Sequence, residues 1–417
     1  MSVRWRGLAG IAAALLSLAS SAAARDFVCK IRAEGNGGDF VSLSAWNDAI
    51  RSDLTAASSL VFAVSDRGSY DPGVDNGATV TFTGGGAGTL KHLSTYDFAY
   101  VVDVAGTVEA GAVALSGSGH TFVVSDTGEQ IARAIAECYN DWPSGLNDRP
   151  QIAGWTTSAE RHVKIFVPPD HRHNGSALIS GGVFAGFGIV QGGWNYHNSL
   201  YINTPFTVVD GMIVRVTNDA GNSSAIGINQ RAIVKNCVIK GHWIRVYAGA
   251  DGTVIVNSVV SDAPAAMRGP SGAYSTSVHV YNCTFADNAE GVNLYAQYGS
   301  AKTSFFRNVL SNNPTNDFAA SGSMQLRLEN CASSDGTAGD HVGAANRVNQ
   351  TFSFADAANR NYRLAREDKG ARFHGADLRQ DPVYPFAADI LGEPRRRLWD
   401  IGAFQLPVPG GTVAVFR

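Results

Sequence analysis

The chain has 417 residues and a formal net charge of -3, so it lacks the extended basic or acidic field that binds nucleic acid or an anionic membrane surface. Glycine is abundant, with 46 residues, and only 17% of the residues are charged. This composition favours an all-β protein with many turns over a helical one.

The first 24 residues have the pattern of a secretory signal peptide. Arg4 and Arg6 precede an apolar stretch at 8–19, and a small-residue cleavage site follows at 22–24. The apolar stretch is too short to cross a bilayer and no second one follows, so we expect no transmembrane span. The sequence therefore predicts a chain that is secreted to the extracellular space or the periplasm and begins near Arg25.

Residues 25–56 are predicted to form a strand followed by a short helix. Leu43, Trp46, Ile50 and Leu54 fall on one face of a helix over 42–54, which begins at a serine. We expect this helix to cap the apolar end of the structure that follows, although an ordinary surface helix has the same pattern.

The residue pattern changes over residues 57–130, where apolar and polar residues alternate between glycine-rich turns. This pattern predicts a small β-rich insertion. Two roles are open for it: a carbohydrate- or partner-binding module, or a long decorated loop.

The following region repeats a short motif built on asparagine, as in VKNCVIKG at 234–241 and YNCTFAD at 281–287. The motif asparagines are separated by 21, 25, 26 and 22 residues: Asn236, Asn257, Asn282, Asn308 and Asn330. Strands are expected before them at 232–235, 253–256, 277–281, 303–307 and 325–329. A second strand after each asparagine, and a third after a polar turn, complete one coil of a solenoid.

Stacking of the coils gives the asparagine a structural role. Each corner asparagine would hydrogen-bond to its copies above and below, about 4.8 Å away. Asp210, which lies 26 residues before Asn236, is expected at the same corner of an earlier coil. The residue after each asparagine is small and is expected to point inward, as for Cys237 and Cys283.

The five cysteines do not indicate a metal site, because no pair has the CxxC spacing of zinc sites. An odd number leaves at least one thiol free. Whether Cys29 and Cys138 form a disulfide is open.

These asparagine corners resemble those of the right-handed parallel β-helix, or pectin-lyase-like, superfamily. The resemblance implies an all-β fold in which a right-handed parallel β-helix covers 131–400 and a C-terminal cap covers 401–417. It also implies that the third segment of each coil lines the face that carries substrate in this superfamily. The chain lacks the paired-aspartate and Arg-Ile-Lys signatures of the glycoside hydrolases and the arginine motif of pectate lyases, so no catalytic residue carries over.

Alignment by the asparagines predicts which side chains face outward from this third segment. Alternation places Ile202, Ile228, Val246 and Leu294 inside. Their outward neighbours form two columns, with Arg268 near the first of them. The outward residues are Tyr201, Gly227, Arg245 and Asn293 in one column and Asn203, Asn229, Tyr247 and Tyr295 in the next.

Such a stripe suits a polysaccharide, because aromatic rings stack on sugars, amides bind hydroxyl groups and arginine pairs with uronate carboxylates. The alternative is that these are ordinary exposed strand residues, since tyrosine favours strands anyway.

Asp262 and Asp287 lie five residues after successive corner asparagines, so the sequence places them about one coil spacing apart. Two neighbouring carboxylates repel, which predicts a cation, and oxygen ligands suit Ca²⁺. Aspartate is also common in turns for local reasons.

Two functions follow from these residues. In the first, the protein is a lyase for extracellular uronate polysaccharides. Arg245 or Arg268 would be the base, His242 or Tyr247 the acid, and Asp262 with Asp287 a calcium site. The β-helix lyases of the resembled superfamily use Ca²⁺ in this way. In the second, the protein is a non-catalytic surface or adhesion protein that uses the solenoid as a rigid rod.

Overall fold

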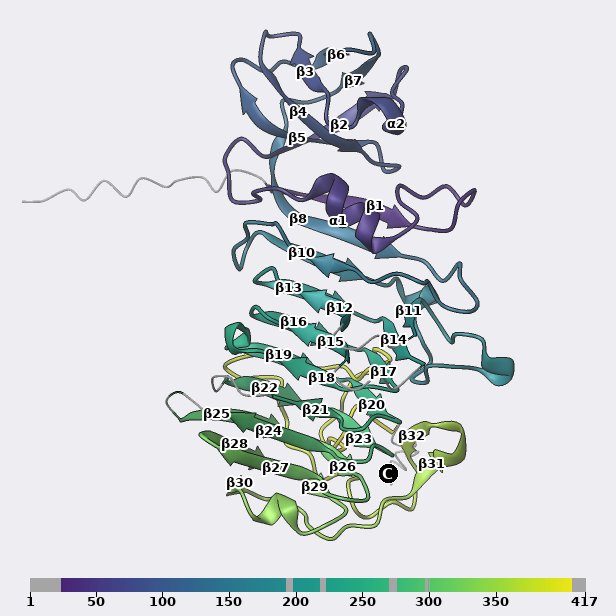
Figure 1. The fold of residues 1–417 in the computed structure, drawn as a ribbon, viewed down its shortest axis with the longest axis vertical. Helices are drawn as coiled ribbons and strands as arrows, with labels where there is room; N and C mark the ends of the chain where they lie inside the picture. Colours follow the sequence, from purple (N-terminus) through teal and green to yellow (C-terminus); the bar gives the residue numbers. More distant parts are fainter. Residues whose placement is uncertain are drawn as a thin grey trace, which may run out of the picture.

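The computed structural model describes residues 24–192, 198–217, 223–269, 276–296, 299 and 301–406. These residues form a stack of coils with a small antiparallel β-module at its N-terminal end (Figure 1). Nearly all of the regular structure is β-strand, and strands of successive coils pair in parallel, so the all-β parallel β-helix prediction is confirmed. In the described residues, no helix is long and apolar enough to cross a membrane.

Three sheets run along the stack. The solenoid part of the first sheet consists of β8 (Glu129–Cys138), β10 (His162–Phe166), β13 (Thr207–Asp210), β16 (Ala232–Lys235), β19 (Thr253–Val256), β22 (Val278–Tyr281), β25 (Lys302–Arg307), β28 (Met324–Glu329) and β30 (Val342–Ala344). The strands expected before the corner asparagines match β16, β19, β22, β25 and β28 to within one residue.

The second and third sheets have seven strands each. The second consists of β11 (Gly188–Gln191), β14 (Ile213–Val216), β17 (Val238–Lys240), β20 (Val259–Ser261), β23 (Thr284–Ala286), β26 (Leu310–Asn312) and β29 (Ala332–Ser333). The third consists of β9 (Gln151–Ile152), β12 (Asn198–Ile202), β15 (Ser224–Ile228), β18 (Ile244–Val246), β21 (Met267–Arg268), β24 (Val292–Ala296) and β27 (Phe318–Gly322).

The corner between the first and second sheets explains why asparagine recurs. All five motif asparagines have a left-handed backbone, with φ between 46° and 54°. Asparagine tolerates this conformation better than most residues, because its short polar side chain hydrogen-bonds locally. Asp210 does not occupy this corner. It pairs with Lys235, and the left-handed residue of its coil is Gly211, so the predicted position of Asp210 is wrong by one residue.

In the described residues, the expected hydrogen bond between successive corner asparagines forms at one pair, Asn282 and Asn308. Asn236 Nδ2 donates to Asp210 Oδ1 at 2.8 Å, and Asn308 Nδ2 donates to Asn282 Oδ1 at 3.1 Å. Asn257 and Asn330 instead donate to backbone carbonyls of the C-terminal part of the chain.

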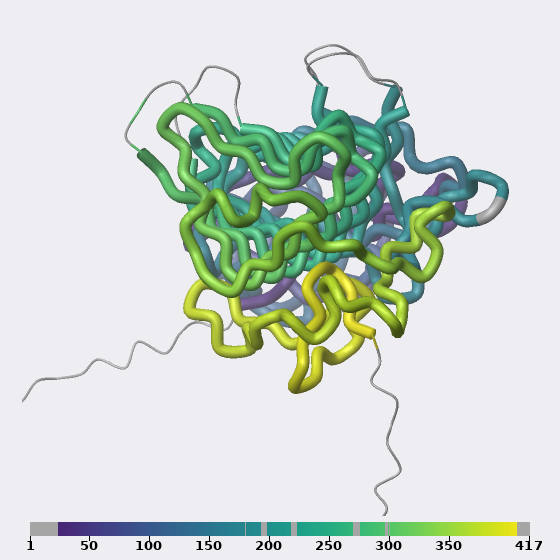
Figure 2. Tube along the Cα trace, turned by 90° about the horizontal axis from the view of Figure 1, so that it is seen from below, coloured from purple at the N-terminus to yellow at the C-terminus, as the bar shows by residue number. Residues whose placement is uncertain are grey.

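The chain after β30 returns along the side of the solenoid. We call residues 345–406 the C-terminal segment; it includes β31 (Phe354–Asp356) and β32 (Asn361–Leu364). Figure 2 shows its yellow part outside the ring of coils. Tyr362, Ile390 and Phe404 pack on outward residues of the second sheet, and Leu378 and Trp399 pack on the first. Regular coils therefore end at β30, before the expected residue 400, because this segment buries the outer face of existing coils. Of the cap expected at 401–417, residues 407–417 lie outside the described part.

At the N-terminal end, β1 (Ala24–Ile31) pairs in parallel with β8, and α1 (Leu43–Ile50) follows. Leu43, Trp46 and Ile50 are buried in the same apolar cluster as β1 and the solenoid interior. The Ser42 side chain accepts a hydrogen bond from the Ala45 backbone amide, as an N-cap does.

Residues 60–124 form the antiparallel module. Its strands pair in a closed ring, so they make a small barrel with its own apolar core. The strands are β2 (Leu60–Asp66), β3 (Thr79–Phe82), β4 (Ala87–Leu93), β5 (Phe98–Ala105), β6 (Gly111–Leu115) and β7 (Thr121–Val124), and the short α2 (Pro72–Asp75) follows β2. Closure leaves the barrel without free sheet edges.

All five cysteines are buried and free, so Cys29 and Cys138 form no disulfide. Cys237 and Cys283 point into the solenoid, where burial raises the pKa of each thiol to about 12. These cysteines therefore serve as small interior residues.

Candidate functional site

The third sheet places the predicted outward residues in register. Tyr201 pairs with Gly227, Gly227 with Arg245, Arg245 with Arg268, and Arg268 with Asn293. The residues expected inside are buried, at 0% exposure for Ile202, Ile228 and Val246 and 1% for Leu294. The asparagine register thus gave the correct column for Arg268. We call the outer surface of β12, β15, β18, β21 and β24 the third-sheet face.

Two arginines stand side by side at the centre of this face. Arg245 and Arg268 occupy neighbouring strands and lie over the same aromatic ring, that of Trp243. Their guanidinium carbons are 5.4 Å and 4.5 Å from its centroid. Trp243 is 2% exposed, so its ring forms the floor beneath both cations. Cation–π contacts of this kind hold guanidinium groups in place.

The positive charge of this pair is only partly balanced. Arg268 Nη2 donates to Glu290 Oε2 over 3.4 Å, and Asn293 Nδ2 donates to the same oxygen at 2.9 Å. Arg245 has no ion pair with any described residue, and the Nε atoms of both arginines are buried without a hydrogen-bond partner. Among the described residues, the two adjacent cations thus face one carboxylate, an arrangement that attracts an anion.

A polar and aromatic group adjoins the arginines. The rings of Tyr201 and Tyr247 meet edge to face at 6.2 Å, and burial raises the pKa of Tyr201. Tyr247 OH donates to Asn198 Oδ1 at 3.5 Å, and Ser224 Oγ donates to the same oxygen. The Asn198 side chain lies over Gly227, where a Cβ atom would come within 2.5 Å of its carboxamide. Glycine is therefore needed at 227 to leave room for Asn198.

Three further predicted residues lie on the same face. Asn229 Nδ2 donates to Asn203 Oδ1 at 2.8 Å, so the two amides form a second short ladder. Tyr295, with 37% exposure, presents its ring to solvent.

His242 does not belong to the exposed surface. Its side chain is 0% exposed and its ring packs against Trp243, with ring centroids 4.0 Å apart. The prediction of His242 as a general acid is therefore wrong, because a buried ring in this position does not reach a substrate on the outer face.

Asp262 and Asp287 lie elsewhere, beside the second sheet, where Arg360 of the C-terminal segment bridges them. Arg360 donates from Nε and Nη2 to Asp262, at 3.0 and 2.5 Å, and from Nη1 to Asp287 at 3.0 Å. Lys240 also pairs with Asp262, and Tyr362 OH donates to Asp287 at 2.9 Å. We call this network the Arg360 clasp.

The Arg360 clasp removes the reason for the calcium prediction, which was the repulsion between two unpaired carboxylates. Burial by itself would raise the pKa of Asp262, but hydrogen bonds from Arg360 and Lys240 outweigh it, and the pKa lies below its usual value. The two aspartates contact neither Arg245 nor Arg268 in the described structure, so the predicted lyase arrangement is not assembled in one place.

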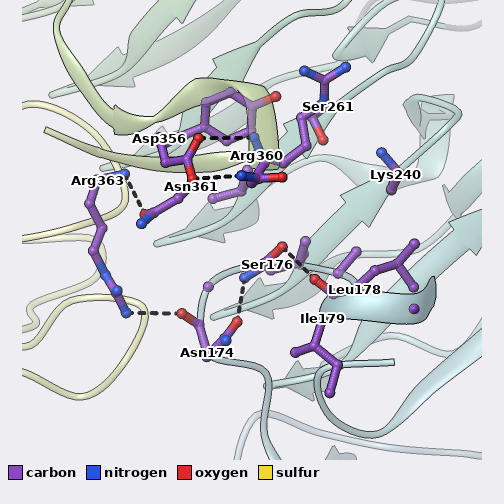
Figure 3. A pocket seen from close by; sticks show the side chains of 17 residues that line it. Asn174, Ser176, Leu178, Ile179, Lys240, Ser261, Asp356, Arg360, Asn361 and Arg363 are labelled. Atoms are coloured by element: carbon purple, nitrogen blue, oxygen red, sulfur yellow. Dashed lines mark hydrogen bonds between the residues drawn. The ribbon is translucent and has the colours of Figure 1, made fainter. Parts of the chain in front are cut away.

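The clasp borders a cavity of about 790 Å³ between the second sheet and the C-terminal segment. Val238 and Val259 are among its apolar lining residues. Asn174, Ser176 and Asn361 are among its polar ones (Figure 3). Arg363 Nη2 donates to Asn174 O at 3.0 Å and joins the two walls at one end. Because Lys240 and Arg360 are already paired with carboxylates, the third-sheet face is the stronger candidate for an anionic ligand.

Comparisons with family models, with curated proteins and with solved structures found no match for this chain. The case for the third-sheet face therefore depends on the geometry of its residues.

Trp243, Asn198, Glu290 and Arg360 were absent from the sequence prediction. The position of Trp243 was predictable from the sequence, because it lies two residues before Arg245 and so points to the same side of the strand. The position of Arg360 was not predictable from the sequence, since it reaches Asp262 across 98 residues of chain.

Proposed function

We propose that the protein binds an acidic, uronate-containing polysaccharide along the third-sheet face. The observation that carries the proposal is the arginine pair: Arg245 and Arg268 stand side by side over Trp243, and in the described part of the chain one carboxylate, that of Glu290, pairs with Arg268. Arginine matches the planar carboxylate of a uronate with two parallel hydrogen bonds. Stacking on Trp243 keeps both guanidinium groups in position before a ligand arrives, which lowers the cost of binding.

The rest of the face supports an extended ligand. Tyrosine side chains recur on alternate strands of the face, with Tyr201 on β12, Tyr247 directly after β18 and Tyr295 on β24, and the Asn203–Asn229 pair lies between the first two. Rings offer apolar faces to sugar C–H groups, and amides offer donors and acceptors to hydroxyl groups. A signal peptide at 1–24 would deliver the protein to the compartment in which such polysaccharides occur.

The proposal is binding, without a cleavage step. Of the groups assigned to a lyase mechanism, His242 is buried and the two aspartates are held in the Arg360 clasp. A rigid solenoid with a binding face is the function that the remaining residues support.

The test measures affinity for soluble polygalacturonate and alginate, with a neutral glucan as the comparison. We expect binding to the two acidic polymers that weakens with added salt, since screening reduces charge attraction. Arg245→Gln and Arg268→Gln should each weaken binding at least about tenfold, because a hydrogen bond to a charged group is worth about 1.5–3 kcal/mol.

The matched control is Arg327→Gln, which removes an exposed arginine from the first sheet, away from this face. It should leave affinity unchanged. Equal affinity of the Arg245→Gln/Arg268→Gln double variant and the wild type would refute the proposal. Absorbance of unsaturated product, followed with and without Ca²⁺, tests the lyase alternative and its calcium requirement in the same mixtures.

A further inference from the structure

A second cluster of reactive side chains lies at the other end of the molecule, between the barrel and the first strand. Cys29 of β1, Asp39 of the following loop and His92 of β4 each direct one donor atom to a common point, and these atoms all lie within 4.8 Å of one another. The Cys29 thiol is 0% exposed, the Asp39 carboxylate 1% and the His92 ring 3%. Thiolate, imidazole and carboxylate are the three ligand types of protein zinc sites.

The histidine is oriented as a metal ligand is. Its Nε2 lies 3.1 Å from Asp39 Oδ1, and its Nδ1 lies 3.2 Å from the Tyr70 hydroxyl. Tyr70 donates its own proton to Asn76 Oδ1 at 2.7 Å, so its oxygen is able to accept a proton from Nδ1 of His92. A metal ion on Nε2 requires the tautomer with the proton on Nδ1, which the Tyr70 oxygen accepts; Asn76 Nδ2, also 3.2 Å from Nδ1, would then have to turn away.

The carboxylate is equally well fixed, and its charge calls for a cation. Asp39 accepts hydrogen bonds from the backbone amides of Lys30 and Thr95, both at 2.7 Å, and from Thr95 Oγ1 at 3.0 Å. These donors are neutral, and among the described residues His92 is the one basic side chain that pairs with Asp39. Asp39 and a Cys29 thiolate together carry two negative charges, which a divalent ion neutralises in a buried site where net charge is costly.

A surface cavity adjoins the cluster at Asp39. A cavity of about 460 Å³ is lined by the glycine-rich loop between Arg32 and Phe40 and includes Asp39. Cys29 and His92 do not line this cavity, so a metal ion coming from it would reach the cluster past Asp39.

We propose that Cys29, Asp39 and His92 bind one divalent ion of the zinc type, and that this ion ties the barrel to the first strand of the solenoid. The sequence does not reveal this site, because it contains no CxxC pair and the three ligands are separated by 10 and 53 residues along the chain. Three distant segments meet only in the fold.

The experiment uses tag-free, full-length protein stripped of metal and then loaded with Zn²⁺ or Co²⁺. We expect about one zinc ion per chain by elemental mass spectrometry, and a thiolate-to-cobalt charge-transfer absorption with Co²⁺. Cys29→Ser and His92→Gln should each abolish stoichiometric zinc binding. Cys29→Ser should also abolish the cobalt charge-transfer band. Cys283→Ser, which changes an equally buried thiol that has no such neighbours, should keep both.

A conservative variant separates a metal site from a structural histidine. Tyr70→Phe removes only the outer hydrogen bond and should weaken zinc binding about 10–100-fold while the cobalt spectrum keeps its shape. The wild-type cobalt spectrum decides the matter even where a variant fails to fold. Absence of a charge-transfer band in the wild type, or a band of full intensity in Cys29→Ser, overturns the proposal.

Discussion

Substitution of Asn282 tests how the corner asparagines stabilise the solenoid. Asn282 is 0% exposed and has a left-handed backbone with φ of 46°. Its Nδ2 donates to the carbonyls of Asp400 and Gly402 at 3.3 and 3.2 Å, and its Oδ1 accepts from Asn308 at 3.1 Å. The residue therefore combines a conformational role with three hydrogen bonds.

The two roles have different magnitudes. Asn282→Gly keeps the left-handed backbone and removes the three hydrogen bonds, each worth about 1 kcal/mol, so the free energy of unfolding should fall by about 3 kcal/mol. Asn282→Ala adds the cost of a left-handed alanine, about 1–2 kcal/mol. The orphaned carbonyls keep Arg395 as a partner, which limits further loss.

Asn330 provides the matched comparison, because it has the same backbone conformation, with φ of 53°, and its side chain makes one hydrogen bond, to His374 O. Asn330→Gly should therefore cost about 1 kcal/mol. Urea unfolding followed by tryptophan fluorescence gives the four free energies, provided that the dependence on urea is unchanged. Equal losses for Asn282→Gly and Asn330→Gly would refute the hydrogen-bond reasoning, and equal stability of Asn282→Gly and Asn282→Ala would refute the conformational part.

Three further outcomes are expected. Arg360→Gln should lower the free energy of unfolding by about 1–2 kcal/mol at neutral pH. Because the pKa of Asp262 is lowered in the folded state, this stabilisation is present above the unfolded pKa of about 3.9 and is lost as the pH falls further. The urea midpoints of variant and wild type should therefore converge in acid, and a difference that stays constant with pH would contradict the Arg360 clasp. Gly227→Ala should displace Asn198 and weaken polysaccharide binding without changing the thermal midpoint by more than a few degrees, whereas unchanged binding would remove Asn198 from the site. A thiol reagent should label none of the five cysteines in the native protein and all of them in denaturant; fewer than five in denaturant without reductant would indicate a disulfide.

The coil architecture was predictable because each coil repeats the same short sequence pattern around its corner asparagine. Asparagine recurs at the left-handed corner of five successive coils, and the residue after it is small because it enters the interior, as Cys237 and Cys283 do. Once that register was known, alternation along the strand was enough to place Arg245 and Arg268 side by side.

The remainder depends on contacts between distant parts of the chain. Asp262 and Asp287 suggested a calcium site only because the partner that neutralises them, Arg360, belongs to a segment with no repeat. Burial of His242 beneath the third-sheet face depends on how Trp243 packs, which alternation alone does not give. Cys29, Asp39 and His92 meet only after the barrel docks on β1.

The course of the C-terminal segment also affects how the protein reaches its native state. In an ideal solenoid each coil touches only its neighbours, so coils are able to form one after another from the N-terminus. Here Asn257 donates to Ala388 O, and Arg395 donates to Asn257 Oδ1, across 131 and 138 residues. Contacts of such high sequence separation slow folding and couple the middle coils to a segment that is synthesised much later than they are. Until the C-terminal segment has been synthesised and has packed, Val254 and Val256 stay exposed to solvent. A chain truncated before residue 345 would therefore fold into a stack with an exposed apolar face and aggregate.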